Sequence, residues 1–232
     1  MKNLFVRTIG ALTLTIAIGY AGSSKIDYLT NACNRGDAKG CYDLGMVYYM
    51  GESVQQDKVK TVKFLTKACD SGYAKGCNDL GIAYKNGEGV QQDYYQAARL
   101  QAKACESGYS AGCYDLGIAY KNGEGVQQDN VSAVGLYAKA CNSGYSKGCN
   151  NAGTLYEQGE GLRQDYTKAA EFYKKACDGE NGLACYNLAA LYVRGKGVEK
   201  DYIKAKVLYG KACDLHDKEG CKNYALLNSH GY

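Results

Sequence analysis

The chain has 232 residues, 46% of them hydrophobic, which is ordinary for a folded protein and excludes an intrinsically disordered chain. Its formal net charge is +4, from 28 basic and 24 acidic residues that alternate in sign and form no basic run. This pattern argues against nucleic acid or an anionic membrane surface as a partner.

The first 21 residues carry the features of a secretory signal peptide. Lys2 and Arg7 precede an apolar stretch over residues 9–18, and small residues at Gly19 and Ala21 predict cleavage after Ala21. The competing interpretation is an uncleaved membrane anchor, which needs about 20 apolar residues. This run is shorter and contains Thr and Gly, so we expect a signal peptide over 1–21 and a mature chain over 22–232. Cleavage would lower the formal charge from +4 to +2, because it removes Lys2, Arg7 and no acid.

The mature region repeats itself every 36 residues. One series of cysteines lies at Cys33, Cys69, Cys105, Cys141, Cys177 and Cys213, and a second at Cys41, Cys77, Cys113, Cys149, Cys185 and Cys221. A fixed period of this length is typical of a solenoid, in which each repeat is one supersecondary unit.

Each repeat predicts two helices. In the second repeat the first helix spans roughly Lys75 to Asn86, where Cys77, Leu80, Gly81 and Tyr84 share one face. Small Gly81 lets another helix approach closely, and the glycines of the following turn end the helix.

The second helix of each repeat begins after an aspartate that predicts an N-cap. This residue recurs as Asp57, Asp93, Asp129, Asp165 and Asp201. We expect the second helix to bury Ala97, Leu100, Ala104 and Cys105, with Phe64, Leu136, Phe172 and Leu208 in the Leu100 position of other repeats. Gly72, Gly108 and Gly144 are expected to end it.

The run Leu-Gly-x-x-Tyr-x-x-Gly-x-Gly-Val-x-x-Asp resembles the Sel1-like repeat, a relative of the tetratricopeptide repeat. With a Cys-x7-Cys pair in every unit, the chain is similar to the Helicobacter cysteine-rich proteins. The resemblance covers the mature chain and implies an all-α fold, a right-handed α/α superhelical solenoid of about twelve helices in disulfide-stapled pairs. Three residues depart from the glycine pattern: Ser53 in the turn, and Glu180 and His216 at the helix stop.

The cysteines favour disulfides over metal. Each pair flanks a short turn between two helices, a geometry suited to a bridge, and an exported protein meets an oxidising compartment. Zinc sites favour Cys-x2-Cys spacing with nearby histidines, and this chain has only His216 and His230. We therefore predict no metal site and six bridges: Cys33–Cys41, Cys69–Cys77, Cys105–Cys113, Cys141–Cys149, Cys177–Cys185 and Cys213–Cys221.

A polar column two residues after the second cysteine of each pair is the candidate ligand-binding site. Its members are Asp43, Asp79, Asp115, Asn151, Asn187 and Asn223, with Asn86, Asn122 and Gln158 further along the same helices. If the first helices line a concave face, this column could hold an extended peptide, because an Asn amide offers both a donor and an acceptor. The alternative is a local role, in which an acid in the first turn stabilises its own helix through the helix dipole. For the Asp members this explanation is as good as ligand binding.

A second column consists of tyrosines, at Tyr48, Tyr84, Tyr120, Tyr156 and Tyr192. Its spacing from Leu and Cys favours a place in the core over a stacking platform for a ligand. Tyr73, Tyr109 and Tyr145, in the loops, are expected to be partly exposed packing residues.

The family resemblance also implies penicillin binding with weak β-lactamase activity. No Ser-x-x-Lys or Lys-[Ser/Thr]-Gly motif of serine β-lactamases occurs, two isolated histidines cannot form a metallo-hydrolase site, and no cysteine is left over if all twelve pair. The catalytic residues are therefore unknown and enzyme status is undecided. The leading hypothesis is a secreted or periplasmic scaffold for peptide or peptidoglycan-derived ligands, with host-cell surface proteins as candidate partners. We expect no cofactor, no membrane association after cleavage, and a monomer.

Overall fold

The structure is a computed structural model that describes residues 25–160 and 162–232, and all regular secondary structure in these ranges is α-helical. The signal peptide expected over 1–21 lies outside the described residues. The chain divides into two compact units, Met1–Ser107 (unit 1) and Gly108–Tyr232 (unit 2), and each is described by itself. None of the helices in the described ranges combines the length and apolar character that crossing a membrane requires.

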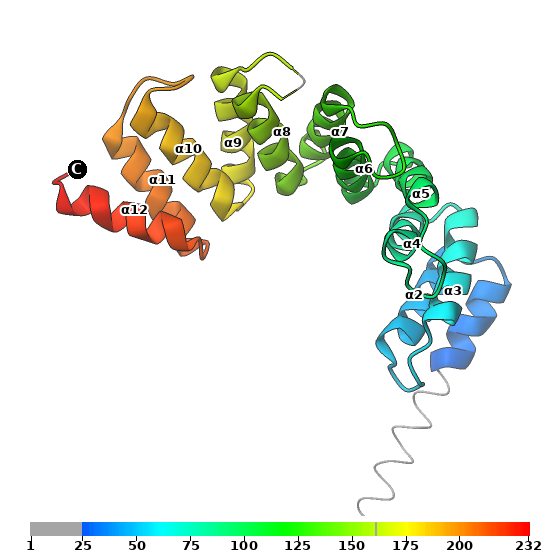
Figure 1. Ribbon diagram of the computed structural model, residues 1–232. Helices are drawn as coiled ribbons and strands as arrows, with labels where there is room; N and C mark the ends of the chain where they lie inside the picture. Colours follow the sequence, from blue (N-terminus) through cyan, green and yellow to red (C-terminus); the bar gives the residue numbers. More distant parts are fainter. Residues whose placement is uncertain (1–24, 161) are drawn as a thin grey trace, which may run out of the picture. The chain divides into compact units, whose positions relative to one another are not determined.

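Unit 1 begins with a helix over residues 25–34 and continues with four helices that pack in sequence order (Figure 1). They are α2 (Ala38–Met50), α3 (Lys58–Asp70), α4 (Ala74–Asn86) and α5 (Tyr94–Glu106). α2 packs on α3, α3 on α4, and α4 on α5, so each helix pair is joined to the next through its second helix.

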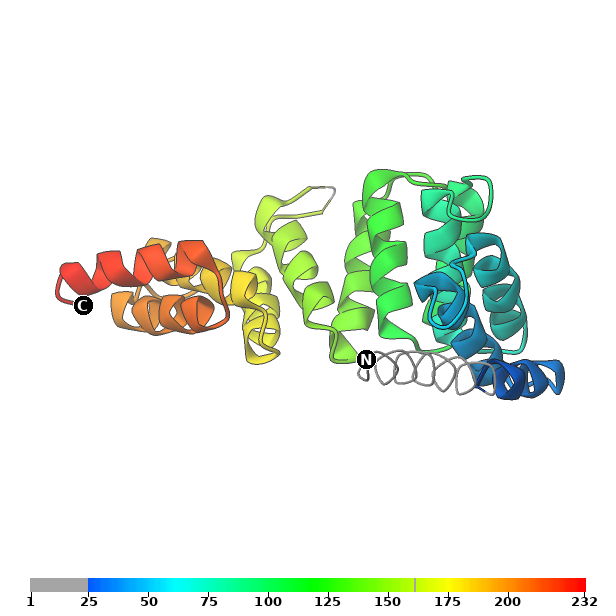
Figure 2. The same ribbon diagram turned by 90° about the horizontal axis from the view of Figure 1, so that it is seen from below.

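Unit 2 continues the same helix-pair pattern. Its helices are α6 (Ser110–Asn122), α7 (Asn130–Asn142), α8 (Ser146–Gln158), α9 (Tyr166–Asp178), α10 (Gly182–Arg194), α11 (Tyr202–Asp214) and α12 (Lys218–Ser229). Figure 2 shows α12, in red, lying along α11, in orange, and α12 also contacts α10. The expected all-α architecture of stacked helix pairs is confirmed within both units.

The helix ends follow the predicted signals. Asp57 accepts a hydrogen bond from the Lys60 backbone N–H at 2.9 Å, and the other four predicted aspartates cap α5, α7, α9 and α11 in the same way. The first helix of a pair ends on a left-handed glycine, such as Gly87 with φ 70°. The positive-φ glycines of the described chain all lie in turns that follow a helix, as these local signals predict.

The cysteines are oxidised. Bridges join Cys33–Cys41, Cys69–Cys77, Cys141–Cys149, Cys177–Cys185 and Cys213–Cys221, with Cα–Cα distances of 4.4–4.6 Å. Cys105 and Cys113 are also disulfide-bonded, and no described cysteine is free. Each bridge that joins two helices of one unit fixes the end of one pair to the start of the next, which confirms the disulfide-stapled arrangement.

One expectation about the core was wrong. Leu100 and its counterpart Phe64 are only half-buried, whereas Gln101, one residue further along, is 3% exposed. The same position is Leu65, Tyr137, Tyr173 and Tyr209 in other repeats, and all four are buried. The physical reason is close packing against a glycine of the first helix, such as Gly117 beside Tyr137, which draws this position inward.

The tyrosine column packs against the core without being fully buried. Tyr48 stacks on Phe64 with ring centroids 5.6 Å apart, and Tyr156 stacks on Phe172 at 5.7 Å. A lysine covers the outer face of each stack, with Lys60 over Tyr48 and Lys168 over Tyr156. The rings of this column therefore serve as half-buried packing residues at the edge of the core.

Candidate functional site

The predicted polar column lies where expected on the first helix of each pair, and all six members are half-buried. Several of them are already used for contacts between repeats. In unit 1 the Tyr42 hydroxyl donates to Asp79 Oδ2 at 2.9 Å, and in unit 2 the Asn187 amide donates to Asn150 Oδ1 at 3.2 Å. In each case the two residues are 37 positions apart, so the column links successive repeats.

Other members of the column are held within their own helix. Asp43 accepts from Lys39 Nζ at 2.6 Å, and the Asn223 amide donates to the Glu219 carbonyl at 2.9 Å. Asn151 lies close enough to the Tyr114 hydroxyl to favour its ionised form, although burial is the larger effect and raises the Tyr114 pKa. The role of the asparagines in holding a ligand stays a prediction.

The two predicted asparagines near the helix ends are exposed. Asn122 donates to Glu124 in the following turn at 2.9 Å. Asn86 lies at the mouth of a pocket in unit 1. Of the predicted ligand-binding residues, the structure therefore brings Asp79 and Asn86 together at one pocket.

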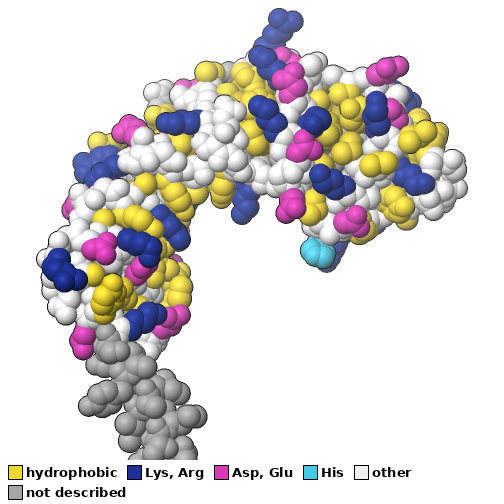
Figure 3. Space-filling model, turned by 180° about the vertical axis from the view of Figure 1, so that it is seen from behind, with side chains coloured by type: hydrophobic (Ala, Val, Ile, Leu, Met, Phe, Trp, Pro, Cys, Tyr) yellow, Lys and Arg dark blue, Asp and Glu magenta, His cyan; other side chains and the backbone are white. Residues whose placement is uncertain are grey.

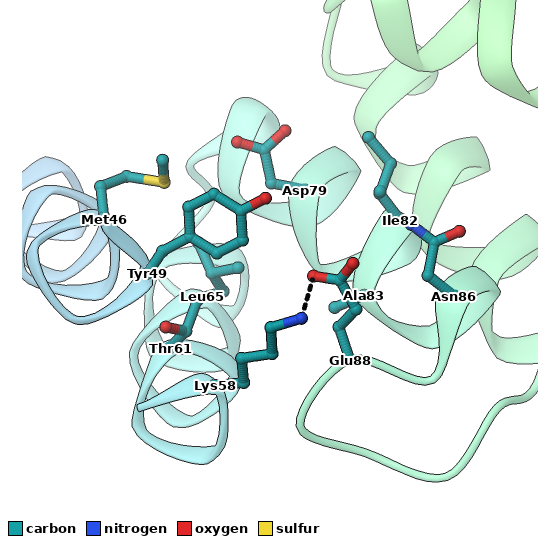
Figure 4. Close-up of a pocket in the computed structure, with 10 residues that line it drawn as sticks. All are labelled: Met46, Tyr49, Lys58, Thr61, Leu65, Asp79, Ile82, Ala83, Asn86 and Glu88. Carbon is teal, nitrogen blue, oxygen red and sulfur yellow. Dashed lines mark ion pairs between the residues drawn. The ribbon is translucent and has the colours of Figure 1, made fainter. Parts of the chain in front are cut away.

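This pocket has a volume of about 240 Å³ and lies between α2, α3 and α4 (Figure 4). Its apolar lining comes from Met46, Tyr49, Leu65, Ile82 and Ala83. Its polar lining comes from Lys58, Thr61, Asp79, Asn86 and Glu88. A hydrophobic floor with a few polar groups at the rim is the usual composition of a binding pocket.

The pocket exists because Leu65 stands where the three repeats of unit 2 have tyrosine. In unit 2, the Tyr173 hydroxyl donates to Glu157 at 2.7 Å and lies 3.3 Å from Thr154 Oγ1. Thr154 and Glu157 are the counterparts, three repeats later, of Met46 and Tyr49. The ring and hydroxyl of Tyr173 thus fill the space that stays open beside Leu65.

The charges around the pocket are two acids and one base. Lys58 Nζ lies 3.5 Å from Glu88 and forms an ion pair with it, drawn as a dashed line in Figure 4. Burial raises the pKa of Asp79, and the hydrogen bond from Tyr42 offsets part of this increase. The ionised form of Asp79 is therefore less well solvated than a surface carboxylate.

The face of the molecule drawn in Figure 3 has mixed charge. Figure 3 shows lysines and arginines interspersed with aspartates and glutamates, with hydrophobic patches between them. This agrees with the alternating charges of the sequence, which gave no basic run.

Sequence reasoning missed the residues that create the pocket. Met46, Tyr49 and Leu65 belong neither to the polar column nor to the Leu100 position, the two patterns on which the sequence prediction of the site and core depended. The available signal was the sequence of residues at 65, 101, 137, 173 and 209, which reads Leu, Gln, Tyr, Tyr, Tyr. A leucine in a position that three other repeats fill with tyrosine indicates unfilled space.

Comparison with solved structures supports a solenoid fold. The chain is similar to c5321, a protective antigen of uropathogenic Escherichia coli, with a TM-score of 0.84 and 30% identity over 88% of this chain and 44% of that chain. It is also similar to a Sel1 repeat protein from Oxalobacter formigenes, with a TM-score of 0.77 and 27% identity over 87% of this chain and 58% of that one. The chain therefore spans about half the length of these two proteins.

A third similar structure is cysteine rich protein B of Helicobacter pylori, with 32% identity, covering 56% of this chain and 94% of that chain at a TM-score of 0.47. A comparison with curated proteins gave no match. The Sel1 repeat model matches five consecutive segments, at residues 38–73, 74–109, 110–145, 146–181 and 182–217. With most of its length accounted for by these repeats, the chain belongs to the Sel1 repeat family.

Proposed function

We propose that this chain is an exported scaffold that binds a peptide segment, from a partner protein or a cell-wall fragment, and anchors it in the pocket between α2, α3 and α4. Sel1 repeats generally mediate interactions between proteins. The observation that carries the proposal is the pocket beside Leu65, which combines an apolar floor with polar groups at its rim.

The pocket suits one side chain of a peptide. Burying a side chain of the size of leucine or methionine contributes about 1.5–3 kcal/mol. Asn86 at the mouth is exposed and carries an amide, which can donate to and accept from a peptide unit. An anchor side chain in the pocket and a main-chain contact at Asn86 together give both affinity and orientation.

The disulfides support export. Bridges of this kind persist in oxidising compartments, so they indicate an extracellular or periplasmic environment. The signal peptide over residues 1–21 and cleavage after Ala21 belong to the same proposal. Mass spectrometry of the protein recovered from the culture medium and from the periplasm would establish both the cleavage site and the compartment.

Selection from a displayed peptide library against the purified, disulfide-bonded mature chain tests the binding function. The decisive variant is Leu65→Tyr, which places in the pocket the side chain that later repeats already carry. We expect selected peptides to lose at least about tenfold in affinity, because the anchor side chain is displaced.

Val59→Tyr is the matched control for this selection. Val59 lies on the same helix as Leu65, is 67% exposed and has Tyr95 as its counterpart in the next repeat. This variant adds the same ring outside the pocket and should leave peptide affinity unchanged. Peptides that bind the parent and Leu65→Tyr equally well would refute the pocket as the anchor point.

β-Lactam hydrolysis, which the family resemblance implies, is the alternative hypothesis. Among the described residues no group of three or more His, Cys, Asp or Glu could hold a metal ion. Binding remains our proposal, because the pocket beside Leu65 supports it directly. Saturable turnover of a chromogenic cephalosporin that persists through repeated purification would reverse this ranking.

A further inference from the structure

Asp79 is a half-buried carboxylate at the edge of the pocket, and its closest described partner is a neutral hydroxyl. Tyr42 donates to it at 2.9 Å. The nearest basic residue along its own helix, Lys75, lies over the Tyr42 ring, 5.0 Å from the ring centroid. Its counterpart in the preceding repeat, Asp43, is neutralised by an ion pair with Lys39 at 2.6 Å. The charge of Lys75 and a hydrogen bond from Asn78 also favour the ionised form of Asp79, but burial is the larger effect and raises its pKa. Unlike Asp43, Asp79 is joined to no base of the described chain by a direct ion pair, so its half-buried charge is only partly compensated.

The other charged residues that line the pocket do not pair with Asp79. The single base in its lining, Lys58, is paired with Glu88. Figure 4 shows Asp79 at one end of the pocket and the Lys58–Glu88 pair at the other. The lining as a whole carries one excess negative charge, located at Asp79.

The walls between these two ends are suited to an aliphatic stem and a flat cation. Met46, Leu65 and Ala83 provide the apolar surface, and the Tyr49 ring, 42% exposed, lies between Leu65 and Asp79 in Figure 4. A cation near a tyrosine face gains from the ring quadrupole, and arginine stacks on aromatic rings more readily than lysine does.

We propose that the pocket takes an arginine side chain of the bound peptide, with its stem on Met46 and Leu65 and its guanidinium between Tyr49 and Asp79. The proposal rests on the proposed function and names the anchor residue of the ligand. A purely apolar side chain would remove water from Asp79 without replacing its hydrogen bonds, which is unfavourable for a carboxylate. A guanidinium replaces that water with charge-assisted hydrogen bonds in a planar geometry that matches the carboxylate.

The probes for the test are alanine pentapeptides whose central residue is arginine, lysine, citrulline or norleucine. Citrulline keeps the shape of arginine and removes its charge, and norleucine keeps only the stem. Titrations into the ¹⁵N-labelled, disulfide-bonded mature chain, followed by amide chemical shifts, give both the affinity and the location. We expect shifts in α2, α3 and α4, and arginine to bind about tenfold more tightly than citrulline.

Two substitutions separate charge from shape. Asp79→Asn keeps the size of the side chain and an acceptor for Tyr42, and asparagine occurs at this position in the repeats that contain Asn151 and Asn187. We expect Asp79→Asn to abolish the difference in affinity between the arginine and citrulline peptides. Asp43→Asn changes the counterpart residue outside the pocket lining and should leave that difference intact.

Each outcome decides the question. Equal binding of norleucine and arginine at the pocket would overturn the arginine assignment while leaving the peptide-binding function standing. Preference for lysine, retained in Asp79→Asn, would also overturn it. Shifts confined to regions outside α2, α3 and α4, or no shifts with any peptide, would overturn it too, and the library selection then shows separately whether peptides bind elsewhere.

Discussion

Tyr173 packs so closely against Gly153 that a Cβ at the glycine would lie 2.8 Å from two ring carbons. This contact lets the ring cross the first helix of its pair, α8, and brings its hydroxyl to Glu157. The large ring of Tyr173 therefore fits only because Gly153 has no side chain. In unit 1 the glycine is kept at Gly45, but Leu65 replaces the tyrosine, and a pocket results.

Replacing Tyr173 should separate the contribution of its ring from that of its hydroxyl. Tyr173→Phe keeps the ring and loses the hydrogen bond to Glu157, so we expect a loss of about 0.5–1.5 kcal/mol in the free energy of unfolding. Tyr173→Leu also opens a cavity and should cost about 2–4 kcal/mol. Denaturant titrations followed by circular dichroism measure both values. If Leu costs no more than Phe, the ring does not fill the space that we assign to it.

The pH dependence of stability should differ in sign between two aspartates of unit 1. Burial raises the pKa of Asp79 in the folded chain, so its contribution to stability is more favourable below the unfolded pKa and falls as the pH rises through the folded pKa. Hydrogen bonding to the Lys60 backbone N–H lowers the pKa of the N-cap Asp57. Its stabilising contribution is present above the unfolded pKa and is lost as the pH falls through the folded pKa.

Asp79→Asn and Asp57→Asn test these opposite signs. Unfolding free energies measured at about pH 3 and about pH 7 bracket the ordinary aspartate pKa. Relative to the parent, Asp79→Asn should become more stable at the higher pH, and Asp57→Asn less stable. A shift in the same direction for both variants would contradict the assignment of burial to Asp79 and of capping to Asp57.

Much of the fold could be predicted because its signals are local and repeat. The N-cap Asp93 and the helix-ending Gly87 act through a few neighbouring backbone groups, so one repeat is enough to recognise them. The pairing of Cys69 with Cys77 follows from the short turn between them. In each case the residue type and its spacing are enough to predict the local structure.

The site was harder to predict because it depends on which of two adjacent helix positions faces inward. Leu100 is the more hydrophobic residue, yet Gln101 is the buried one, because it packs against Gly81 of the first helix. Periodicity within α5 does not distinguish these two faces sharply. The pocket arises because this position is leucine in one repeat and tyrosine in the repeats of unit 2. The contact of Asp79 with Tyr42 depends on how two successive repeats stack.

The residues that depart from the glycine pattern should store strain. Ser53, Glu180 and His216 are the three non-glycine residues with positive φ in the described chain, at 64°, 61° and 66°. The left-handed conformation costs about 1–2 kcal/mol for an L-residue, and a glycine in the same place avoids this cost. Glycine also has more conformational freedom in the unfolded chain, which lowers the stability of the folded state by about 0.5–1 kcal/mol.

Restoring glycine at Glu180 or His216 should therefore raise the free energy of unfolding by about 0.5–1 kcal/mol per site. Glu180→Ala is the control, because alanine removes the carboxylate and keeps the Cβ, so it should give no such gain. Denaturation midpoints of the three variants against the parent measure the effect. Equal stabilisation by alanine and glycine at position 180 would show that the side-chain charge, and not the backbone, is responsible.

Removing one bridge should damage the chain locally. Cys141–Cys149 joins α7 to α8 within unit 2, closing a short loop, and its loss through the double substitution Cys141→Ala and Cys149→Ala should cost about 2–3 kcal/mol. Repeats in a solenoid contact mainly their neighbours, so stability is close to a sum of local terms. Amide hydrogen exchange should show reduced protection in α7 and α8, with α11 and α12, which retain the Cys213–Cys221 bridge, close to the parent. A uniform loss of protection from α7 to α12 would instead show that unit 2 unfolds as one cooperative block.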